Sequence, residues 1–172
     1  MHVQLIGPMC AGKSRIGREL APLLGLPFAD LDRVIESHIG PITPFFQREG
    51  EEAFRQIEAV VLGELLAGPA SVIATGGGTP CGGDNLVRMK QAGTVIFLDV
   101  PLEVLMPRVE RSGGDRPLLF GFKGEALQHR VQELLLPRMP IYRQAHHIIQ
   151  AIGSPQAIAM RIVDLLRTDQ AR

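Results

Sequence analysis

The chain has 172 residues, 45% of them hydrophobic and 21% charged, so we expect one globular domain with its own core and not a disordered chain. Its 18 basic and 18 acidic residues give a formal net charge of zero, which argues against a general nucleic-acid binder. Because it has no bilayer-length apolar run, no signal-peptide pattern and only two cysteines, we expect a reduced cytoplasmic protein that acts away from membranes. We also expect a monomer.

Short apolar runs alternate with longer amphipathic patterns in the first half of the chain. Residues 3–6 predict a strand that ends at a glycine, and a helix is predicted at 13–24. A weak strand at 27–29 comes before a clear amphipathic helix at 51–66. Residues 71–75 predict another strand, which stops at three consecutive glycines.

The same alternation continues to the end of the chain. Helices are predicted at 84–91, 101–111 and 155–167, and strands at 94–98 and 147–150. Strands that are apolar throughout and separated by helices are typical of a parallel sheet that helices cover on both faces. Ligands of such sheets bind beyond the carboxyl ends of the strands.

One loose stretch interrupts this pattern, at residues 112–124. It contains four glycines, two before Arg116 and two after it, and it lies between two helical patterns. This composition predicts a mobile lid that carries an arginine.

The segment GPMCAGKS at residues 7–14 fits the phosphate-loop pattern G-x-x-x-x-G-K-[ST]. It follows a predicted strand and opens a predicted helix, so its backbone N–H groups and the helix N-terminus favour a phosphate there. Lys13 is expected to reach the β- and γ-phosphates and Ser14 to bind Mg²⁺. The alternative is a chance match in a glycine-containing turn.

Two carboxylates follow the second predicted strand. On an extended chain Asp30 and Asp32 would face the same side, where one could hold Mg²⁺ and the other could orient or deprotonate a hydroxyl group. The alternative is that one of them only caps the helix that begins near Arg33.

Three further features are ambiguous when each is taken alone. Arg55 lies off the apolar face of its helix, and by spacing alone a solvated ion pair with Glu58 is the favoured interpretation. The glycines at 76–78 allow a ligand to approach the backbone closely, although a flexible turn would also use them. Arg138, between two prolines, could be an ordinary surface residue.

Taken together, these segments resemble the shikimate kinases over roughly residues 2 to 165. The phosphate loop, the FADLD and GEEAFRQIE segments, the TGGGTP turn, the RPLL of the lid and the PRMPIYRQA segment occur in the order of the family. The resemblance implies transfer of the γ-phosphoryl group of ATP to the 3-hydroxyl of shikimate. It also implies one three-layer α/β domain of the P-loop NMP-kinase type over 1–172, with a five-stranded parallel sheet, an acceptor-binding region at about 31–60 and a lid at about 112–124.

The resemblance also implies roles for individual residues. Lys13, Asp32 and Arg116 correspond to the catalytic residues, Asp32 being the base, and Ser14 and Asp30 to the residues at Mg²⁺. The implied ATP-binding residues are Gly7, Met9, Cys10, Ala11, Gly12, Lys13, Ser14, Arg15, Arg111, Arg116 and Pro155. The implied shikimate-binding residues are Asp32, Arg55, Gly76, Gly77, Gly78 and Arg138.

The chain departs from the family at several positions. Cys10 stands where glycine is usual, and we expect the loop to form only if Cys10 keeps a negative φ. A thiol at this position could have a lowered pKa, so Cys10 and Cys81 could make the activity sensitive to oxidation, the alternative being two inert thiols. Pro137 is expected to end a helix just before Arg138 and could shift the direction of that side chain. The pair at 146–147, two histidines, is expected to be structural, because no third metal ligand has a suitable spacing.

Two other functions remain open at this point. A kinase of gluconate or another hydroxy acid would use the same phosphate loop, and a nucleotide-dependent regulatory protein could keep that loop without turnover.

Overall fold

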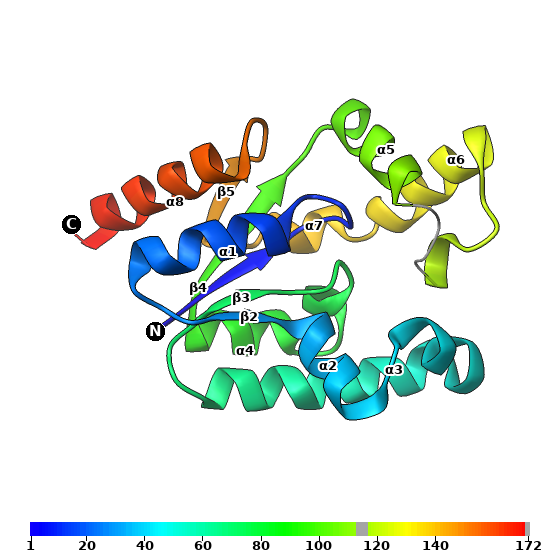
Figure 1. Ribbon diagram of the computed structural model, residues 1–172, viewed down its shortest axis with the longest axis horizontal. Coiled ribbons are helices and arrows are strands. Elements are labelled where there is room, and N and C mark those ends of the chain that lie inside the picture. Colours follow the sequence, from blue (N-terminus) through cyan, green and yellow to red (C-terminus); the bar gives the residue numbers. More distant parts are fainter. Residues whose placement is uncertain (113–116, 171–172) are drawn as a thin grey trace.

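Five strands form one sheet with helices on both faces in the computed structural model, which describes residues 1–112 and 117–170 (Figure 1). All strand pairs are parallel, in the order β2-β3-β1-β4-β5, so the strand before the phosphate loop is central. The predicted parallel sheet and three-layer α/β architecture are confirmed. The strands are β1 (His2–Ile6), β2 (Phe28–Asp30), β3 (Val72–Ala74), β4 (Gly93–Asp99) and β5 (His147–Gln150).

The helices form two layers around this sheet. α1 and α8 lie side by side on one face, and α3 and α4 lie together on the other (Figure 1). In the described residues, none is long and apolar enough to cross a membrane. The α-helices are α1 (Lys13–Leu24), α2 (Leu31–Ile39), α3 (Ile42–Ala67), α4 (Asn85–Ala92), α5 (Leu102–Arg111), α6 (Gly124–Leu135), α7 (Met139–Tyr142) and α8 (Pro155–Gln170), with short 3₁₀ turns η1 (Thr79–Cys81) and η2 (Pro117–Leu119).

The sheet separates two clusters of buried apolar side chains. Along β4, Ile96 and Leu98 belong to the cluster under α1 and α8, whereas Val95 and Phe97 belong to the cluster under α3 and α4. Successive strand residues point to opposite faces, so this apolar run supplies both clusters at once. The two clusters pack against the two faces of the sheet, and because all strands are parallel their carboxyl ends lie at a single edge.

Two predicted element boundaries are wrong. β2 ends at Asp30 and α2 begins at Leu31, so Asp32 lies in the first turn of a helix and not on an extended strand. The helix predicted at 51–66 is the second half of α3, which begins at Ile42 and is interrupted by Gly50. The helix α6 begins at Gly124, the last residue of the predicted lid.

Candidate active site

A cavity of about 560 Å³ lies beside the loop between β1 and α1. The Lys13 side chain is 7% exposed, and its Nζ donates hydrogen bonds to the carbonyl oxygens of Gly7 (2.8 Å) and Pro8 (2.6 Å). These bonds hold the ammonium group against the loop, close to where a phosphate would meet the N-terminus of α1. The predicted nucleotide-binding residues that line this cavity are Cys10, Ala11, Gly12, Lys13, Ser14, Arg15, Arg111 and Pro155.

The other predicted nucleotide residues lie elsewhere. Gly7 contributes one of the two carbonyls that Lys13 contacts, and Met9 lines the neighbouring cavity. Arg116 lies outside the described residues. Arg108, which we did not predict, lines the nucleotide cavity with its Nη1 3.5 Å from the carbonyl oxygen of Cys10. Its position three residues before Arg111, one helical turn away, was the available sequence signal.

The expectation for the backbone at Cys10 is wrong. Cys10 has φ +59°, in the left-handed region, and the loop forms nevertheless. Residues other than glycine can adopt this region at a cost of about 1–2 kcal/mol. The Cys10 side chain packs against the cluster under α1, whereas Cys81 packs against the opposite cluster. Burial raises the pKa of Cys81, partly offset by Arg138 and Arg55, so its thiolate form is disfavoured.

Both predicted carboxylates line the nucleotide cavity, although for a different structural reason. Asp30 ends β2 and Asp32 starts α2, and a strand-to-helix turn brings the two side chains to the same cavity. Asp30 occupies the N-cap position of α2 without a side-chain capping bond, so the capping alternative does not explain it. Asp32 also lines the second cavity.

The oxygen ligands at the nucleotide cavity suit Mg²⁺. The Ser14 hydroxyl and the Asp30 carboxylate line the same space, and Mg²⁺ typically takes one or two protein oxygens beside phosphate and water. The described residues contain no group of three or more histidine, cysteine or acidic side chains that could enclose a metal ion.

A second cavity of about 560 Å³ adjoins the first. Its apolar wall comes from both halves of α3, through Ile42, Phe46 and Phe54. Asp32, Gly76, Gly77 and Ser112 line both cavities, so the two meet at the turn after β3. All residues predicted to bind the acceptor line this second cavity: Asp32, Arg55, Gly76, Gly77, Gly78 and Arg138.

Arg55 is held in the second cavity by acidic neighbours on its own helix. Its Nη1 donates to Glu58 Oε2 at 2.7 Å and its Nη2 to Glu51 Oε1 at 3.1 Å. Burial alone would lower the pKa of Arg55, but its interactions with Glu58 and Glu51 raise the pKa above the ordinary value. The predicted ion pair with Glu58 exists, but it is not a solvated one: Arg55 is 24% exposed and Glu58 1%.

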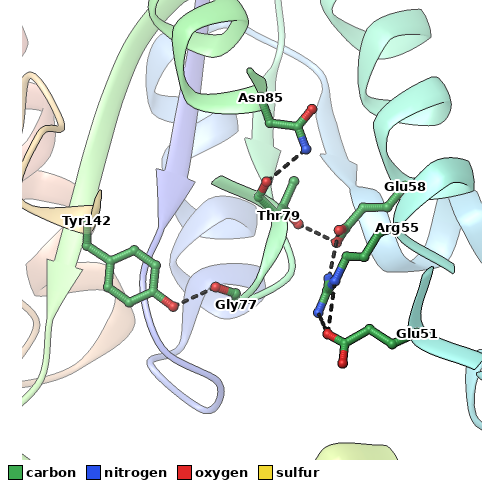
Figure 2. A network of polar contacts seen from close by, with 7 residues as sticks. All are labelled: Glu51, Arg55, Glu58, Gly77, Thr79, Asn85 and Tyr142. Carbon is green, nitrogen blue, oxygen red and sulfur yellow. Dashed lines mark hydrogen bonds and ion pairs between the residues drawn. The ribbon is translucent and has the colours of Figure 1, made fainter. Parts of the chain in front are cut away.

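Glu58 is the main site residue that we did not assign. It is buried, lines the second cavity and accepts hydrogen bonds from Arg55 and from the hydroxyl of Thr79 (Figure 2). The signal was present in the GEEAFRQIE segment, where this residue lies one helical turn after Arg55. We interpreted it only as a surface partner of the arginine.

Tyr142 fixes the turn that separates the two cavities. Its hydroxyl donates to the carbonyl oxygen of Gly77 at 2.5 Å (Figure 2). Burial raises the pKa of Tyr142 well above its usual range, although Arg138 opposes the change, so the phenol keeps its proton. α6 ends at Leu135, so the helix stops before Arg138 as Pro137 predicts, and Arg138 still lines the second cavity.

The two adjacent histidines have structural partners. His146 Nδ1 accepts a hydrogen bond from the backbone N–H of Val95, and His147 Nε2 lies 2.7 Å from a carboxylate oxygen of Asp169. Their predicted structural role is confirmed by these contacts, which join the residue before β5 to β4, and β5 itself to α8.

Comparison with known proteins gives a consistent set of relatives. A sequence model of the family described as shikimate kinase matches residues 9–167. A shikimate kinase of Acinetobacter baumannii (strain AYE) is 39% identical over 174 residues, which cover 99% of this chain and 94% of that protein. A shikimate kinase of Parabacteroides distasonis is 43% identical over 145 residues, 84% of each chain.

Solved structures agree with these sequence matches. The structure of shikimate kinase from Acinetobacter baumannii in complex with shikimate superposes with a TM-score of 0.91 at 39% identity, covering 99% of this chain and 95% of that one. A gluconokinase from Sinorhizobium meliloti 1021, at 17% identity and a TM-score of 0.62, covers 98% of this chain and 96% of its own. That likeness is one of fold alone.

Proposed function

The chain belongs to the shikimate kinase family, and on that premise we propose that it transfers the γ-phosphoryl group of ATP to the 3-hydroxyl group of shikimate where its two cavities meet. It is an ATP-dependent kinase of the pathway to the aromatic amino acids, and shikimate is its acceptor. The observation that supports the placement is the convergence of every predicted acceptor residue on a cavity that adjoins the phosphate loop. We further expect a cytoplasmic monomer that binds no nucleic acid.

The nucleotide phosphates would lie against the loop between β1 and α1. Lys13 is buried beside them and would exchange its bonds to the loop carbonyls for bonds to the phosphate oxygens. Phosphoryl transfer spreads charge over the equatorial oxygens, so a fixed cation there lowers the barrier. We assign Arg116 to the same charge on the strength of the family resemblance.

We assign Ser14 and Asp30 to Mg²⁺, since both line the nucleotide cavity. When bound, Mg²⁺ neutralises part of the phosphate charge and orients the transferred group. Ser14 follows Lys13 at the start of α1, so the residue that would hold the ion is fixed relative to the one that would hold the phosphates.

The acceptor side combines two cations and one carboxylate. Arg55 lines the cavity from α3 and Arg138 from the turn between α6 and α7, and both would bind the shikimate carboxylate through their planar guanidinium groups. Asp32 borders both cavities, so it is placed to accept the proton of the attacking hydroxyl as that group approaches the phosphate.

The activity is tested by measuring ADP release with Mg²⁺-ATP and shikimate, beside gluconate, quinate and no acceptor. We expect rapid turnover with shikimate only. Turnover with gluconate and not with shikimate would overturn the assignment of shikimate as the acceptor, but the chain would still be a kinase. Because Asp32→Asn removes the proton acceptor, it should lower kcat while ATP affinity stays near that of the wild type.

A further inference from the structure

Thr79 and Glu58 form a buried polar pair behind the acceptor cavity. Thr79 is 0% exposed and Glu58 is 1% exposed. The Thr79 hydroxyl donates to Glu58 Oε1 at 2.6 Å, and Glu58 Oε2 accepts from Arg55 Nη1 at 2.7 Å (Figure 2). Each carboxylate oxygen of Glu58 thus has its own hydrogen-bond donor. Arg55 lies on the same helix as Glu58, whereas Thr79 lies in a later segment of the chain.

The second donor matters because the carboxylate can rotate. A glutamate held only by an arginine on the same helix can turn with that arginine, since both side chains are long. A short bond from a buried hydroxyl fixes one oxygen of Glu58 and so directs the other toward Arg55. Hydrogen bonds to charged groups are also stronger than those between neutral groups.

The position of Thr79 is itself fixed from two sides. Its N–H donates to the carbonyl oxygen of Gly76 at 3.3 Å, and its own carbonyl accepts from Nδ2 of the buried Asn85 at 2.8 Å. A Cβ added at Gly76 would lie 3.0 Å from both Glu58 Oε1 and Thr79 Oγ1. The hydrogen bond therefore lies directly against the backbone that borders both cavities.

We propose that Thr79 is a positioning residue for the acceptor, which holds Glu58 by a hydrogen bond and through Glu58 sets the place of the Arg55 guanidinium group. This inference rests on the proposed role of Arg55 in binding the carboxylate of shikimate. Thr79 is buried and lines neither of the two cavities, so we expect its effect on acceptor affinity and not on the chemical step.

The test is Thr79→Val, which keeps the shape of the side chain and removes the hydroxyl. We expect the KM for shikimate to rise about tenfold, the size of a lost hydrogen bond to a charged group, with kcat and the KM for ATP nearly unchanged. Thr79→Ser keeps the donor and should restore the KM to near the wild-type value.

Ser71→Ala is the matched control. It also removes a buried hydroxyl, one that pairs with His2 Nδ1 at 3.1 Å at the opposite end of β3. It should lower the melting temperature without moving the KM for shikimate. An equal rise in KM in Ser71→Ala would mean that general loosening explains the effect, and would overturn the proposal.

Arg55→Lys separates this inference from the proposed function. If it leaves the KM for shikimate unchanged, the assigned role of Arg55 fails. If it raises the KM but Thr79→Val does not, only the inference about Thr79 fails. In a protein that already carries Arg55→Lys, Thr79→Val should raise the KM for shikimate by much less than tenfold, because both substitutions act through the side chain at position 55.

Should Thr79→Val not fold, Thr79→Cys takes its place, because a thiol is only a weak donor. It should raise the KM for shikimate severalfold, and an unchanged KM overturns the proposal.

Discussion

At the scale of single residues, Gly78 shows how closely the acceptor turn approaches the arginine beside it. A Cβ at Gly78 would lie 2.5 Å from Nη2 of Arg55, and the backbone there has φ −90°, which suits any residue. Gly78→Ala therefore tests crowding without backbone strain. We expect a rise of tenfold or more in the KM for shikimate, about 1.4 kcal/mol, with little change in the KM for ATP.

Gly68→Ala is the control for that substitution. Gly68 also has a negative φ, and its added Cβ would meet only ordinary contacts, the nearest 3.4 Å away, at the far end of α3. In steady-state kinetics Gly68→Ala should have the wild-type KM for shikimate. A Gly78→Ala enzyme with unchanged shikimate KM would contradict the placement of Arg55.

Cys10 allows a second test on a single residue. Because its φ is +59°, glycine should be the more stable replacement and alanine the less stable one, by about 1 kcal/mol in free energy of unfolding. Urea denaturation of Cys10→Gly and Cys10→Ala measures this difference. Greater stability of the alanine variant would show that the loop backbone at this position has a negative φ in solution.

At the scale of elements, the interruption of α3 shapes the acceptor cavity. Gly50 has φ 85° and ψ 175°, a conformation almost restricted to glycine, and it lets the Ile42 and Phe46 half of α3 turn relative to the half that carries Arg55. Gly50→Ala should lower the free energy of unfolding by about 1–3 kcal/mol and weaken shikimate binding. Calorimetric titration with shikimate and urea denaturation measure the two effects.

The neighbouring Glu49→Ala serves as the control, since Glu49 is 45% exposed and its ion pair with Arg48 lies at the surface. Its effect should stay within about 0.5 kcal/mol. If Gly50→Ala behaves in the same way, the interruption of α3 is not required by the fold.

The elements that sequence predicts well are those with one strong local signal. The phosphate-loop pattern marks where the first strand ends and where the first helix begins, and α1 begins at Lys13 as predicted. α6 was expected only as a helical pattern between the lid and Pro137, without a residue range, because the glycine at its start gives no clear first turn. Its apolar positions Leu127, Val131 and Leu134 nevertheless have helical spacing.

The acceptor side was predictable only through the family resemblance. Spacing alone favoured a solvated Arg55–Glu58 pair, because nothing in a local pattern says that Thr79, 21 residues later, packs against Glu58. Long-range burial of this kind depends on the whole sheet. The role of Arg116 and the mobility of the lid remain predictions.

At the scale of the whole molecule, the free energy of unfolding should depend on pH through His146. Partial desolvation of this largely exposed ring, together with the charges of Lys90 and His147, lowers the pKa of His146 in the folded protein, and its Nδ1 must stay unprotonated to accept from Val95. Below about pH 6.5 the unfolded chain therefore binds more protons than the folded one. This part of the stability is complete above about pH 6.5 and is lost as the pH falls through the lowered pKa.

Urea denaturation between pH 5 and 8 measures this dependence. His146→Gln keeps an acceptor for the Val95 N–H without a titrating group, so its curve should be flatter than that of the wild type in the acidic range. If the free energy of unfolding depends on pH in the same way in both proteins, His146 is not a source of that dependence.

The wall shared by the two cavities has a consequence for inhibition. Because Asp32, Gly76 and Gly77 border both spaces, a nucleoside diphosphate and a cyclohexene carboxylate could be joined through a bridge about as long as one phosphoryl group. Such a bisubstrate compound would make its second binding event intramolecular, with a gain of about 10²–10⁴ in affinity over either half. Its nucleotide half would also bind the phosphate loops of many other kinases, so its selectivity would come from the half that contacts Arg55 and Arg138.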